Sequence, residues 1–345
     1  MTVLGFATPT SDVEVFLSIG IPTYRREESV LQLLNLLATV ECTVQCEVLV
    51  INNGPYLDLS AQREALLRAG YIVNILQNRV NCGGQENALR VYEFALGRYV
   101  WYLGDDDRFY VPAFKKVVEL LLMHEPDCLL LNADTPGETL PSYPSGVLNE
   151  DQVFGGHFAL GRLICAPLNV LRRDSILQSL PRARLFLGCF APQFLLVLLG
   201  NVRTFFYLNE PTLHQKDVPV VHSQKLSVLP IFLGIGGLMD VPSDPARAVS
   251  VRRLLKREWR TLISPLHVLG SITIDEINGR KHSYFPFFRA GLKCYPCLLS
   301  LGFAVSLLVL KVVPKKSLLP LLHWYANTVK KRGIDTENFR SWDRI

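Results

Sequence analysis

The stretch Tyr99-Val-Trp-Tyr-Leu-Gly-Asp-Asp-Asp107 decides the fold, because it joins a short apolar run directly to three consecutive aspartates. Residues 99–103 have the aromatic and β-branched composition of a buried strand. Three carboxylates at one strand end repel each other and raise one another's pKa values unless a cation lies among them. A hard divalent ion, held by one or two carboxylates and completed by phosphate oxygens and water, satisfies this arrangement. The stretch therefore predicts a strand end that binds a cation together with a phosphate.

The residues before this stretch alternate between strand patterns and helix patterns. Apolar runs predict strands over 16–22, 47–54 and 72–77, and leucine or alanine spacing predicts helices over 29–40, 60–69 and 85–97. With the strand at 99–103, this alternation predicts an α/β fold whose mostly parallel sheet is flanked by helices on both faces. In such folds, ligands bind beyond the carboxyl ends of the strands.

Polar residues follow every predicted strand and are the candidate ligand-binding residues. Asn-Gly and Gly-Gly pairs also form ordinary turns, and for Asn53-Gly54 that explanation is as good as a functional one. It is a poor explanation for three aspartates behind a buried strand. The candidates are Pro22, Thr23, Tyr24 and Arg25 after the first strand, Asn52 and Asn53 after the second, Asn78 to Gly84 after the third, and Asp105, Asp106 and Asp107 after the fourth.

Other phosphate-binding patterns do not fit this part of the sequence. A Walker loop requires Gly-x4-Gly-Lys-Ser/Thr, which is not present. A dinucleotide fold requires Gly-x-Gly-x-x-Gly after the first strand, where residues 21–25 read Ile-Pro-Thr-Tyr-Arg. Phosphatases with an aspartyl nucleophile place it after an early strand, whereas this acidic cluster follows the fourth.

The composition excludes a disordered or fibrous protein, because 49% of the 345 residues are hydrophobic and 19% are charged. Residues 1–150 carry 10 Lys/Arg and 19 Asp/Glu, net −9, and residues 151–345 carry 26 and 12, net +14. We therefore expect the two parts to contact different partners. Eight scattered cysteines and an N-terminus unlike a signal peptide predict a reducing, cytosolic environment. Cys294 and Cys297 have redox-pair or half-zinc-site spacing but lack a strand-turn-helix context.

Four segments in order resemble the family-2-type glycosyltransferases with the GT-A fold. The sequence of residues 101–107 is most similar to that of the abequosyltransferase-like branch, whose members build bacterial surface polysaccharides. The resemblance covers about residues 14–125 and implies a nucleotide-sugar donor. The four segments are Leu17–Arg25, Val48–Gly54, Asn78–Gly84 and Tyr99–Asp107.

The resemblance also implies roles for individual residues. Asp105 to Asp107 is the Asp-x-Asp element, in a frame that Pro112 supports. Asp107 is then the ligand of Mg²⁺ or Mn²⁺, and Asp105 contacts the ribose or sugar side of the donor; Asp106 replaces either if the frame shifts by one. Thr23, Tyr24 and Asn53 line the base and ribose pocket, and Asn78, Gly83 and Gly84 approach the donor. The metal neutralises the charge that grows on the nucleoside diphosphate as it leaves.

The sequence departs from the family pattern at two places. Many relatives have an aspartate after the second strand that contacts the base, where Asn52 and Asn53 stand here, so the nucleotide is left open. Relatives also carry a Glu-Asp pair, with the catalytic base, at a later helix start, which corresponds here to Ala191 and Pro192. Either the substrate assists the reaction or the base comes from elsewhere in the chain. The candidates for the base are Asp134, His214 and Asp217; for the last two, a solvated loop is the simpler interpretation.

The C-terminal part predicts contact with a membrane. Residues 246–345 carry 18 Lys/Arg and 6 Asp/Glu around the uncharged 17-residue run 294–310. A helix of that length spans about 25 Å, less than the roughly 30 Å hydrocarbon core. Basic residues flank the run on both sides, so an interfacial helix fits better than a single span or a buried core helix, although both stay open. The basic residues border apolar runs instead of exposed aromatics, which favours anionic lipid over nucleic acid.

Together these patterns predict a GT-A-like catalytic domain over residues 1–220 and a basic, apolar helical region over 221–345. The expected activity is metal-dependent, inverting transfer of a sugar to a polyprenyl-diphosphate-linked saccharide at the cytoplasmic face of the inner membrane. The product class would be O-antigen, capsule or exopolysaccharide. Two alternatives stay open. A GT-A-like nucleotidyltransferase would need a Gly-rich, Lys-containing first loop, and a non-catalytic member would bind donor or membrane and organise an assembly complex.

Overall fold

The structure is a computed structural model that describes residues 2–3, 14–134, 143–158, 160–187, 192–214, 245–262 and 312. The chain divides into two compact units, of which the first comprises residues 1–187, 191–216 and 241–250. The predicted boundary at residue 220 stays a prediction, because the predicted second region lies almost wholly outside the described residues.

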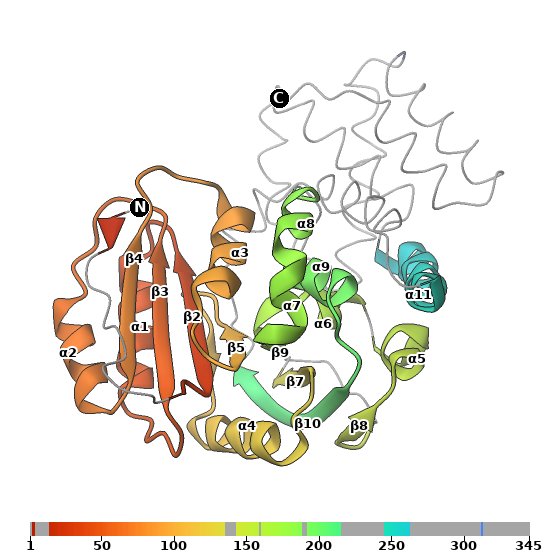
Figure 1. Ribbon diagram of the computed structural model, residues 1–345, viewed down its shortest axis with the longest axis horizontal. Coiled ribbons are helices and arrows are strands. Elements are labelled where there is room, and N and C mark those ends of the chain that lie inside the picture. The colour runs from red at the N-terminus through yellow and green to blue at the C-terminus, as the bar shows by residue number, and fades with distance from the viewer. Residues whose placement is uncertain are drawn as a thin grey trace, which may run out of the picture. The chain divides into compact units, whose positions relative to one another are not determined.

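The first half of the chain has the predicted alternation of strands and helices, with each element within a few residues of its expected position (Figure 1). The elements are β2 (Leu17–Thr23), α1 (Glu27–Leu37), β3 (Cys46–Asn52), α2 (Ser60–Arg68), β4 (Ile72–Gln77), α3 (Gly84–Phe94) and β5 (Tyr99–Tyr102). A short strand, β1 (Thr2–Val3), pairs with β4.

The strands after β5 join the same sheet, and helices lie between them in the chain. They are β6 (Arg108–Phe109), α4 (Val111–His124), β7 (Cys128–Asp134), β8 (Gly146–Leu148), α5 (Glu150–Gln152), η1 (Val153–His157), α6 (Leu160–Ile164), η2 (Ala166–Leu168), β9 (Asn169–Arg172), α7 (Arg173–Ile176), η3 (Leu177–Ser179), α8 (Leu180–Arg184), α9 (Pro192–Leu199), β10 (Phe205–His214) and α11 (Pro245–Leu262). The later helix that the family resemblance implies near Pro192 is therefore present as α9, and β10 follows it.

The described strands form one sheet in the order β1-β4-β3-β2-β5-β9-β7-β10-β6, with β8 paired to β10. The four strands predicted from sequence, β2 to β5, are parallel to one another. β9 runs antiparallel to both β5 and β7, and β10 runs parallel to β7. The prediction of a mixed α/β fold with mostly parallel central strands is confirmed, and the sequence analysis missed the antiparallel strand in the middle.

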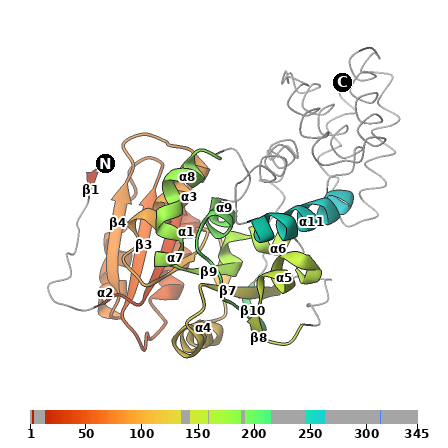
Figure 2. The ribbon, with the colours of Figure 1, turned by 45° about the vertical axis from the view of Figure 1, so that its right-hand side comes forward.

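Close packing of α3 on β2 depends on Gly20. A Cβ atom at this position would lie 2.0 Å from Cγ1 of Val91 on α3, a distance that no side chain can occupy. The opposite face carries an apolar core that combines the strands with the buried side chains of α1 and α4. Figure 2 shows α3 beside α8 over the same part of the sheet. The tight α3–β2 contact brings the N-terminus of α3 to the edge where β2 ends.

A buried carboxylate joins the first strands to the end of α3. Glu47 is fully buried and accepts hydrogen bonds from Ser18 Oγ, from Asn74 Nδ2 at 2.7 Å and from the backbone N–H of Leu96 at 2.9 Å. Ser18 Oγ in turn accepts the N–H of Gly97 at 2.7 Å. Asn74 Oδ1 is buried without a hydrogen-bond partner, whereas the other polar atoms named here meet partners, so the network fixes the register of β2, β3 and β4 and the exit of α3.

The predicted membrane-binding run at 294–310 and the pair Cys294 and Cys297 lie outside the described residues. Among the residues that the structure describes, none of the helices has both the length and the apolar character needed to cross a bilayer.

Candidate active site

The carboxyl ends of β2, β3 and β4 meet at one edge of the sheet. Thr23 at the end of β2 pairs with Asn52 on β3, and Asn52 pairs with Gln77 on β4. The N–H of Asn53 donates to the carbonyl of Thr23 at 2.9 Å, which continues the pairing beyond the strand ends. The polar residues that the sequence analysis selected after these strands are thus neighbours in space.

The three aspartates form a tight turn behind β5. The N–H of Asp107 donates to the carbonyl of Gly104 at 3.0 Å, and Oδ2 of Asp107 accepts the N–H of Gly104 at 2.6 Å. A Cβ at Gly104 would lie 2.9 Å from this carboxylate oxygen, so the residue before the cluster must be small. The turn holds Asp105, Asp106 and Asp107 within one loop at the edge where β2 ends.

Asp105 is the buried member of the cluster. Its Oδ2 accepts the hydroxyl of Thr23 at 2.7 Å, and its Oδ1 lies 3.0 Å from Nη1 of Arg26. Burial raises the pKa of Asp105 above the usual range, although Thr23 and the charge of Arg26 lower it in part, and Asp106 raises it further. The ionised carboxylate is therefore held at this strand end against its own desolvation cost.

Arg26 is a site residue that the sequence analysis missed. It precedes α1, and its Nη1 lies 3.1 Å from Asp106 Oδ2 as well as close to Asp105. Burial alone would lower the pKa of Arg26, but the charges of Asp105 and Asp106 outweigh it and raise the pKa. The sequence offers two adjacent arginines, and only the fold shows that the second one, not Arg25, meets the aspartates.

An amide network joins the loops after β3 and β4. Asn53 Oδ1 accepts from Asn78 Nδ2 at 2.9 Å and from the N–H of Cys82 at 3.0 Å, while Asn53 Nδ2 donates to Asn81 Oδ1 at 2.7 Å. Asn52 Nδ2 donates to the carbonyl of Pro55 at 2.6 Å. The side chains expected to contact a nucleobase thus also shape the loops around it, and their contact with a base stays a prediction.

The N-terminus of α3 faces the same edge. Gly83 has a φ of +84°, which a residue with a side chain rarely adopts, and it directly precedes the helix. Asn87 on α3 accepts from Asn78 and donates to the carbonyl of Ile51 at 3.1 Å. The free N–H groups and the dipole of a helix N-terminus favour an anion, which fits the expected approach of Gly83 and Gly84 to a diphosphate.

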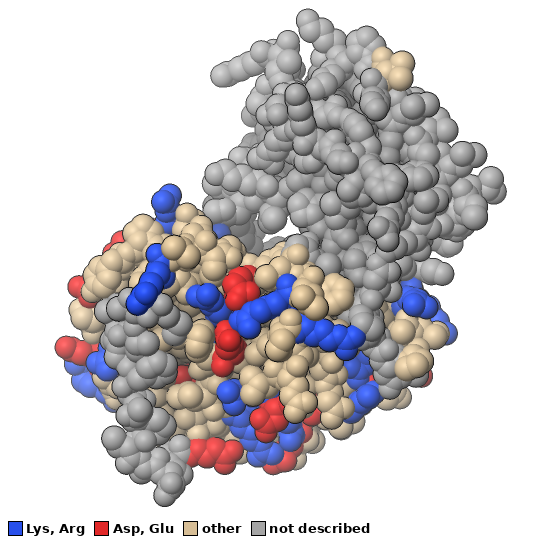
Figure 3. All heavy atoms as spheres, turned by 45° about the horizontal axis from the view of Figure 1, so that its top comes forward, with Lys and Arg blue, Asp and Glu red and all other residues tan. Residues whose placement is uncertain are grey.

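Ion pairs hold α3 against α8. Arg184 lies 3.1 Å from Glu86 and 2.7 Å from Glu93, and Arg90 on α3 donates to Asn78 Oδ1. Figure 3 shows acidic and basic side chains interleaved on one face of the described residues. These contacts fix the helix whose N-terminus borders the site.

Aromatic side chains border the same edge. Tyr24 is 41% exposed, and the guanidinium of Arg25 lies 5.3 Å from the centre of its ring. Arg25 has a φ of +56°, so the turn after β2 is held in a left-handed conformation. Tyr56, on the loop after β3, is 70% exposed. Tyr24 is therefore available at the position where the sequence predicts a base pocket.

The predicted base candidates Asp134 and His214 come together at the ends of β7 and β10. The two residues pair in register, and the hydroxyl of Tyr110 donates to Asp134 Oδ2 at 3.1 Å. His214 also pairs with Arg108, which directly follows Asp107. Asp217 lies outside the described residues. On α9, Pro192 stands at the second position of the family's acidic pair, and the next residue, Gln193, is buried and donates to the carbonyl of Ile164, so neither offers a carboxylate.

The aspartate loop fits a divalent cation by the chemistry of its donors. Carboxylate oxygens are the ligands that Mg²⁺ and Mn²⁺ prefer, and a cation, the Arg26 guanidinium, already bridges Asp105 and Asp106. Within the described ranges, no group of three His, Cys, Asp or Glu side chains is placed to hold a metal ion together. Mg²⁺ sites often combine one or two carboxylates with substrate phosphates, which is the arrangement expected here.

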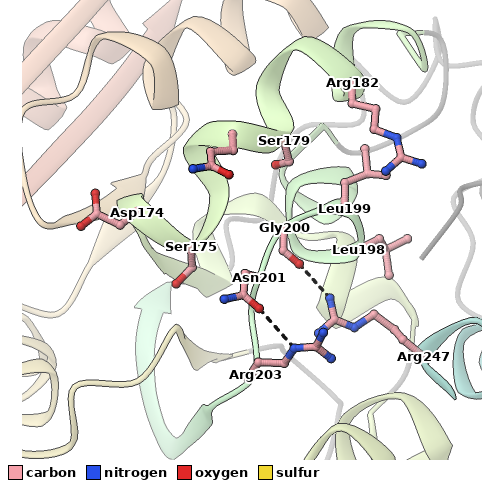
Figure 4. A pocket seen from close by; sticks show the side chains of 11 residues that line it. Asp174, Ser175, Ser179, Arg182, Leu198, Leu199, Gly200, Asn201, Arg203 and Arg247 are labelled. Atoms are coloured by element: carbon pink, nitrogen blue, oxygen red, sulfur yellow. Dashed lines mark hydrogen bonds between the residues drawn. The ribbon is translucent and has the colours of Figure 1, made fainter. Parts of the chain in front are cut away.

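A cavity of about 580 Å³ lies at the opposite edge of the sheet, beside the amino ends of β7 and β10 (Figure 4). Arg247 on its wall is 2% exposed and donates to the carbonyls of Val197, Gly200 and Val202 while pairing with Glu150. This arginine is occupied by structural contacts. None of the residues selected from the sequence lines the cavity.

The residues of this site lie within a segment that comparison with known families identifies. Residues 18–164 match the family Glycosyl transferase family 2. The match contains every residue that builds the edge from Thr23 to Asp107. It confirms the predicted resemblance at the level of this family, while the abequosyltransferase-like branch stays a prediction. Among curated proteins, none matches the sequence.

Solved structures support the fold. The chain is similar to residues 1–349 of S. aureus TarS crystallised with UDP-GlcNAc, with a TM-score of 0.57 and 16% identity, covering 85% of this chain and 88% of that chain. The complex of the same TarS segment with UDP gives a TM-score of 0.56 at 15% identity with the same coverage, and the segment in a further crystal structure gives 0.53 at 14%, covering 81% and 88%. At these identities the likeness establishes a GT-A-like fold.

Two carboxylates with opposite pKa shifts, Asp105 in the site and Asp127 before the start of β7, test how burial and hydrogen bonds affect stability. Because the pKa of Asp105 is raised in the fold, its ionised form lowers stability above that pKa, and Asp105→Asn should melt at or slightly above the parent's temperature at pH 7.

For Asp127, burial would raise the pKa, but hydrogen bonds from Ser175 Oγ and from the N–H groups of Arg203 and Thr204 outweigh it and lower the pKa. Asp127→Asn should therefore lose about 1–2 kcal/mol of stability at pH 7.

Thermal melts of the parent and both variants between pH 3 and pH 7 check this prediction. Stability from Asp127 is present above the unfolded pKa of about 3.9 and is lost as the pH falls through the lower folded pKa. The difference between Asp127→Asn and the parent should thus shrink toward pH 3. A marked loss of stability in Asp105→Asn at pH 7 would contradict the account, because it would mean that the ionised carboxylate stabilises the fold, whereas its raised pKa implies the reverse.

Proposed function

We propose that this protein is a glycosyltransferase that transfers a sugar from a nucleotide-sugar donor bound at the carboxyl ends of β2 to β5. The observation that carries the proposal is the family 2 match over residues 18–164, since it contains the aspartate loop, the amide network and the N-terminus of α3. The shared edge of these elements offers carboxylates, amides and helix N–H groups to one ligand. A nucleoside diphosphate attached to a sugar matches this combination of groups.

Each part of the edge has a task in donor binding. Tyr24 offers an aromatic face to the base, and the loops fixed by Asn53 and Asn78 border the ribose and the diphosphate. Gly83 allows the diphosphate to approach the α3 backbone without a side chain in the way. Mg²⁺ or Mn²⁺ at Asp107 and Asp105, when bound, supplies positive charge for the departing diphosphate. These residues hold and orient the donor so that its anomeric carbon faces the acceptor.

Proton removal from the acceptor hydroxyl is assigned to the pair at the ends of β7 and β10. Asp134 accepts from Tyr110 at 3.1 Å, which orients its carboxylate, and His214 lies in register beside it. Inversion at the anomeric carbon is part of the proposal: the deprotonated hydroxyl would attack this carbon from the face opposite the departing diphosphate. Asp217 is kept as a further candidate from the sequence.

One observation favours a second candidate function. The sequence has Ala191 and Pro192 where family members have the acidic pair, as expected of a protein that binds a donor without transferring it. Such a member would organise an assembly complex. Turnover of any sugar nucleotide, measured as release of nucleoside diphosphate, separates the two functions.

The metal assignment is tested by Asp107→Ala with Asp106→Ala as its matched control. Asp107→Ala should lower transfer and Mn²⁺-dependent donor binding by about a hundredfold or more, since it removes charge stabilisation that acts on the leaving group. Asp106→Ala should be milder, because Asp106 takes the variable middle position of the Asp-x-Asp frame. Calorimetric titration with UDP or UDP-GlcNAc and Mn²⁺ measures both; these are first probes because TarS crystals contain them. Parent-like turnover by Asp107→Ala would remove this residue from the site.

The acceptor proposed for this reaction is a polyprenyl-diphosphate-linked saccharide at the cytoplasmic face of the membrane, with a surface polysaccharide as the product. Its support comes from the sequence of residues 246–345, with net charge +12 around the run 294–310. Each Lys or Arg near an anionic surface contributes about 1 kcal/mol and is screened by salt, whereas apolar burial is not.

The protein should therefore sediment with anionic liposomes at low salt, and high salt should release it fully only after deletion of residues 294–310. Neutral phosphatidylcholine liposomes are the control for the electrostatic part. Full-length protein that stays in the supernatant with anionic liposomes at low salt would contradict the membrane proposal and leave the donor site untouched.

A further inference from the structure

Arg26 connects two carboxylates through one atom. Its Nη1 lies 3.0 Å from Asp105 Oδ1 and 3.1 Å from Asp106 Oδ2. The guanidinium thus takes the position between carboxylates that the sequence analysis assigned to a cation. The repulsion expected among neighbouring aspartates is relieved by the chain's own charge.

The side chains of Asp105, Asp106 and Arg26 differ in how much of each is exposed to solvent. The Asp105 side chain is 5% exposed and held by Thr23, whereas the side chains of Arg26 and Asp106 are each 32% exposed. Arg26 reaches the cluster from the solvent side on a long side chain. It can move away by changing its rotamers, while Asp105 cannot leave without disturbing the end of β2.

A divalent ion on Asp105 and Asp107 and the guanidinium of Arg26 compete for the carboxylate of Asp105. Both cations cannot contact Asp105 without strong repulsion, since unit charges about 4 Å apart interact strongly in a partly buried site. A diphosphate changes this balance, because its oxygens match the planar fork of an arginine and give the displaced side chain a new partner.

We propose that Arg26 is an exchangeable counter-ion of the aspartate loop, which holds Asp105 and Asp106 in the donor-free protein and moves to the diphosphate when metal and nucleotide bind together. This role rests on the proposed function of the site. It makes Arg26 a positioning residue that keeps the loop from binding a metal ion alone. Metal and nucleotide then bind with positive coupling, which is reciprocal by thermodynamic linkage.

The test is titration of Mn²⁺ alone, followed by the electron paramagnetic resonance of the free ion. The variants Arg26→Gln and Arg26→Met remove the charge and keep much of the side-chain volume. Arg98→Gln is the matched control, because Arg98 is also 32% exposed and pairs with a carboxylate, Glu125 at 2.7 Å, at the opposite end of β5. Arg26→Lys keeps the positive charge. Thermal melts of all samples verify that each variant folds.

Both neutral variants should bind Mn²⁺ alone about tenfold or more tightly than the parent, a change of about 1.4 kcal/mol. Arg26→Lys and Arg98→Gln should stay within about threefold of the parent, since the former keeps the charge and the latter lies far from the loop. Adding Asp107→Ala to Arg26→Gln should abolish the gain. In the presence of UDP, the advantage of the neutral variants should disappear, because Arg26 then contributes to nucleotide binding.

Equal or weaker Mn²⁺ binding by both neutral variants would overturn the role of Arg26, and so would an equal gain in Arg98→Gln. Donor turnover by the parent is measured separately. If the parent transfers sugar while the neutral variants gain no Mn²⁺ affinity, the proposed function stands and the counter-ion role falls. If the parent neither binds nor turns over any sugar nucleotide, the proposed function falls, and the role of Arg26 toward a diphosphate falls with it.

Discussion

The hydrogen bond from Thr23 to Asp105 is the contact on which the arrangement of the site depends. It joins the end of β2 to the loop after β5, two segments 82 residues apart in sequence, at a distance of 2.7 Å. Burial makes this carboxylate costly to ionise, so the fold must supply partners for it, and Thr23 and Arg26 are those partners. Proteins commonly accept such a cost at functional positions. Once Arg26 has moved to the diphosphate, the Asp105 carboxylate is already in place to bind a cation.

The neighbouring helix, loops and strands hold the Thr23–Asp105 contact in place. Gly20 allows α3 to pack directly on β2, so the helix N-terminus at Gly83 reaches the edge next to Thr23. Asn53 and Asn78 join the two loops that lie between them. Glu47 fixes the strands further from the edge through a network of its own. The loops that carry the polar groups of the site are therefore anchored to parallel strands and one helix, which hold these groups more firmly than unanchored loops would.

The sequence predicts the strands, the helices and the location of the site, because apolar periodicity and strand-end polarity are local signals. It does not predict the antiparallel insertion of β9, since a four-residue strand has no signal that sets its direction or its neighbours. It also does not distinguish Arg26 from Arg25, because the turn geometry after Tyr24 decides which guanidinium meets the aspartates. The sequence also does not show that the side chains of Asn52 and Asn53 bind neighbouring loops, because an asparagine gives the same sequence pattern in a turn as in a base pocket. The pairing of Asp134 with His214 depends on the register of two strands separated by 70 residues, which only the fold provides.

The central claim is that a nucleoside diphosphate binds at the carboxyl ends of β2 to β5, with its phosphates between the aspartate loop and the N-terminus of α3. A crystal structure of the protein with UDP-GlcNAc and Mn²⁺ tests it most directly. The account predicts the diphosphate beside Gly83 and Gly84, the metal on Asp107, and Arg26 turned from Asp105 toward the phosphates. Nucleotide bound instead in the cavity lined by Ser179 and Arg182 at the opposite edge, with the aspartate loop unchanged, would contradict it.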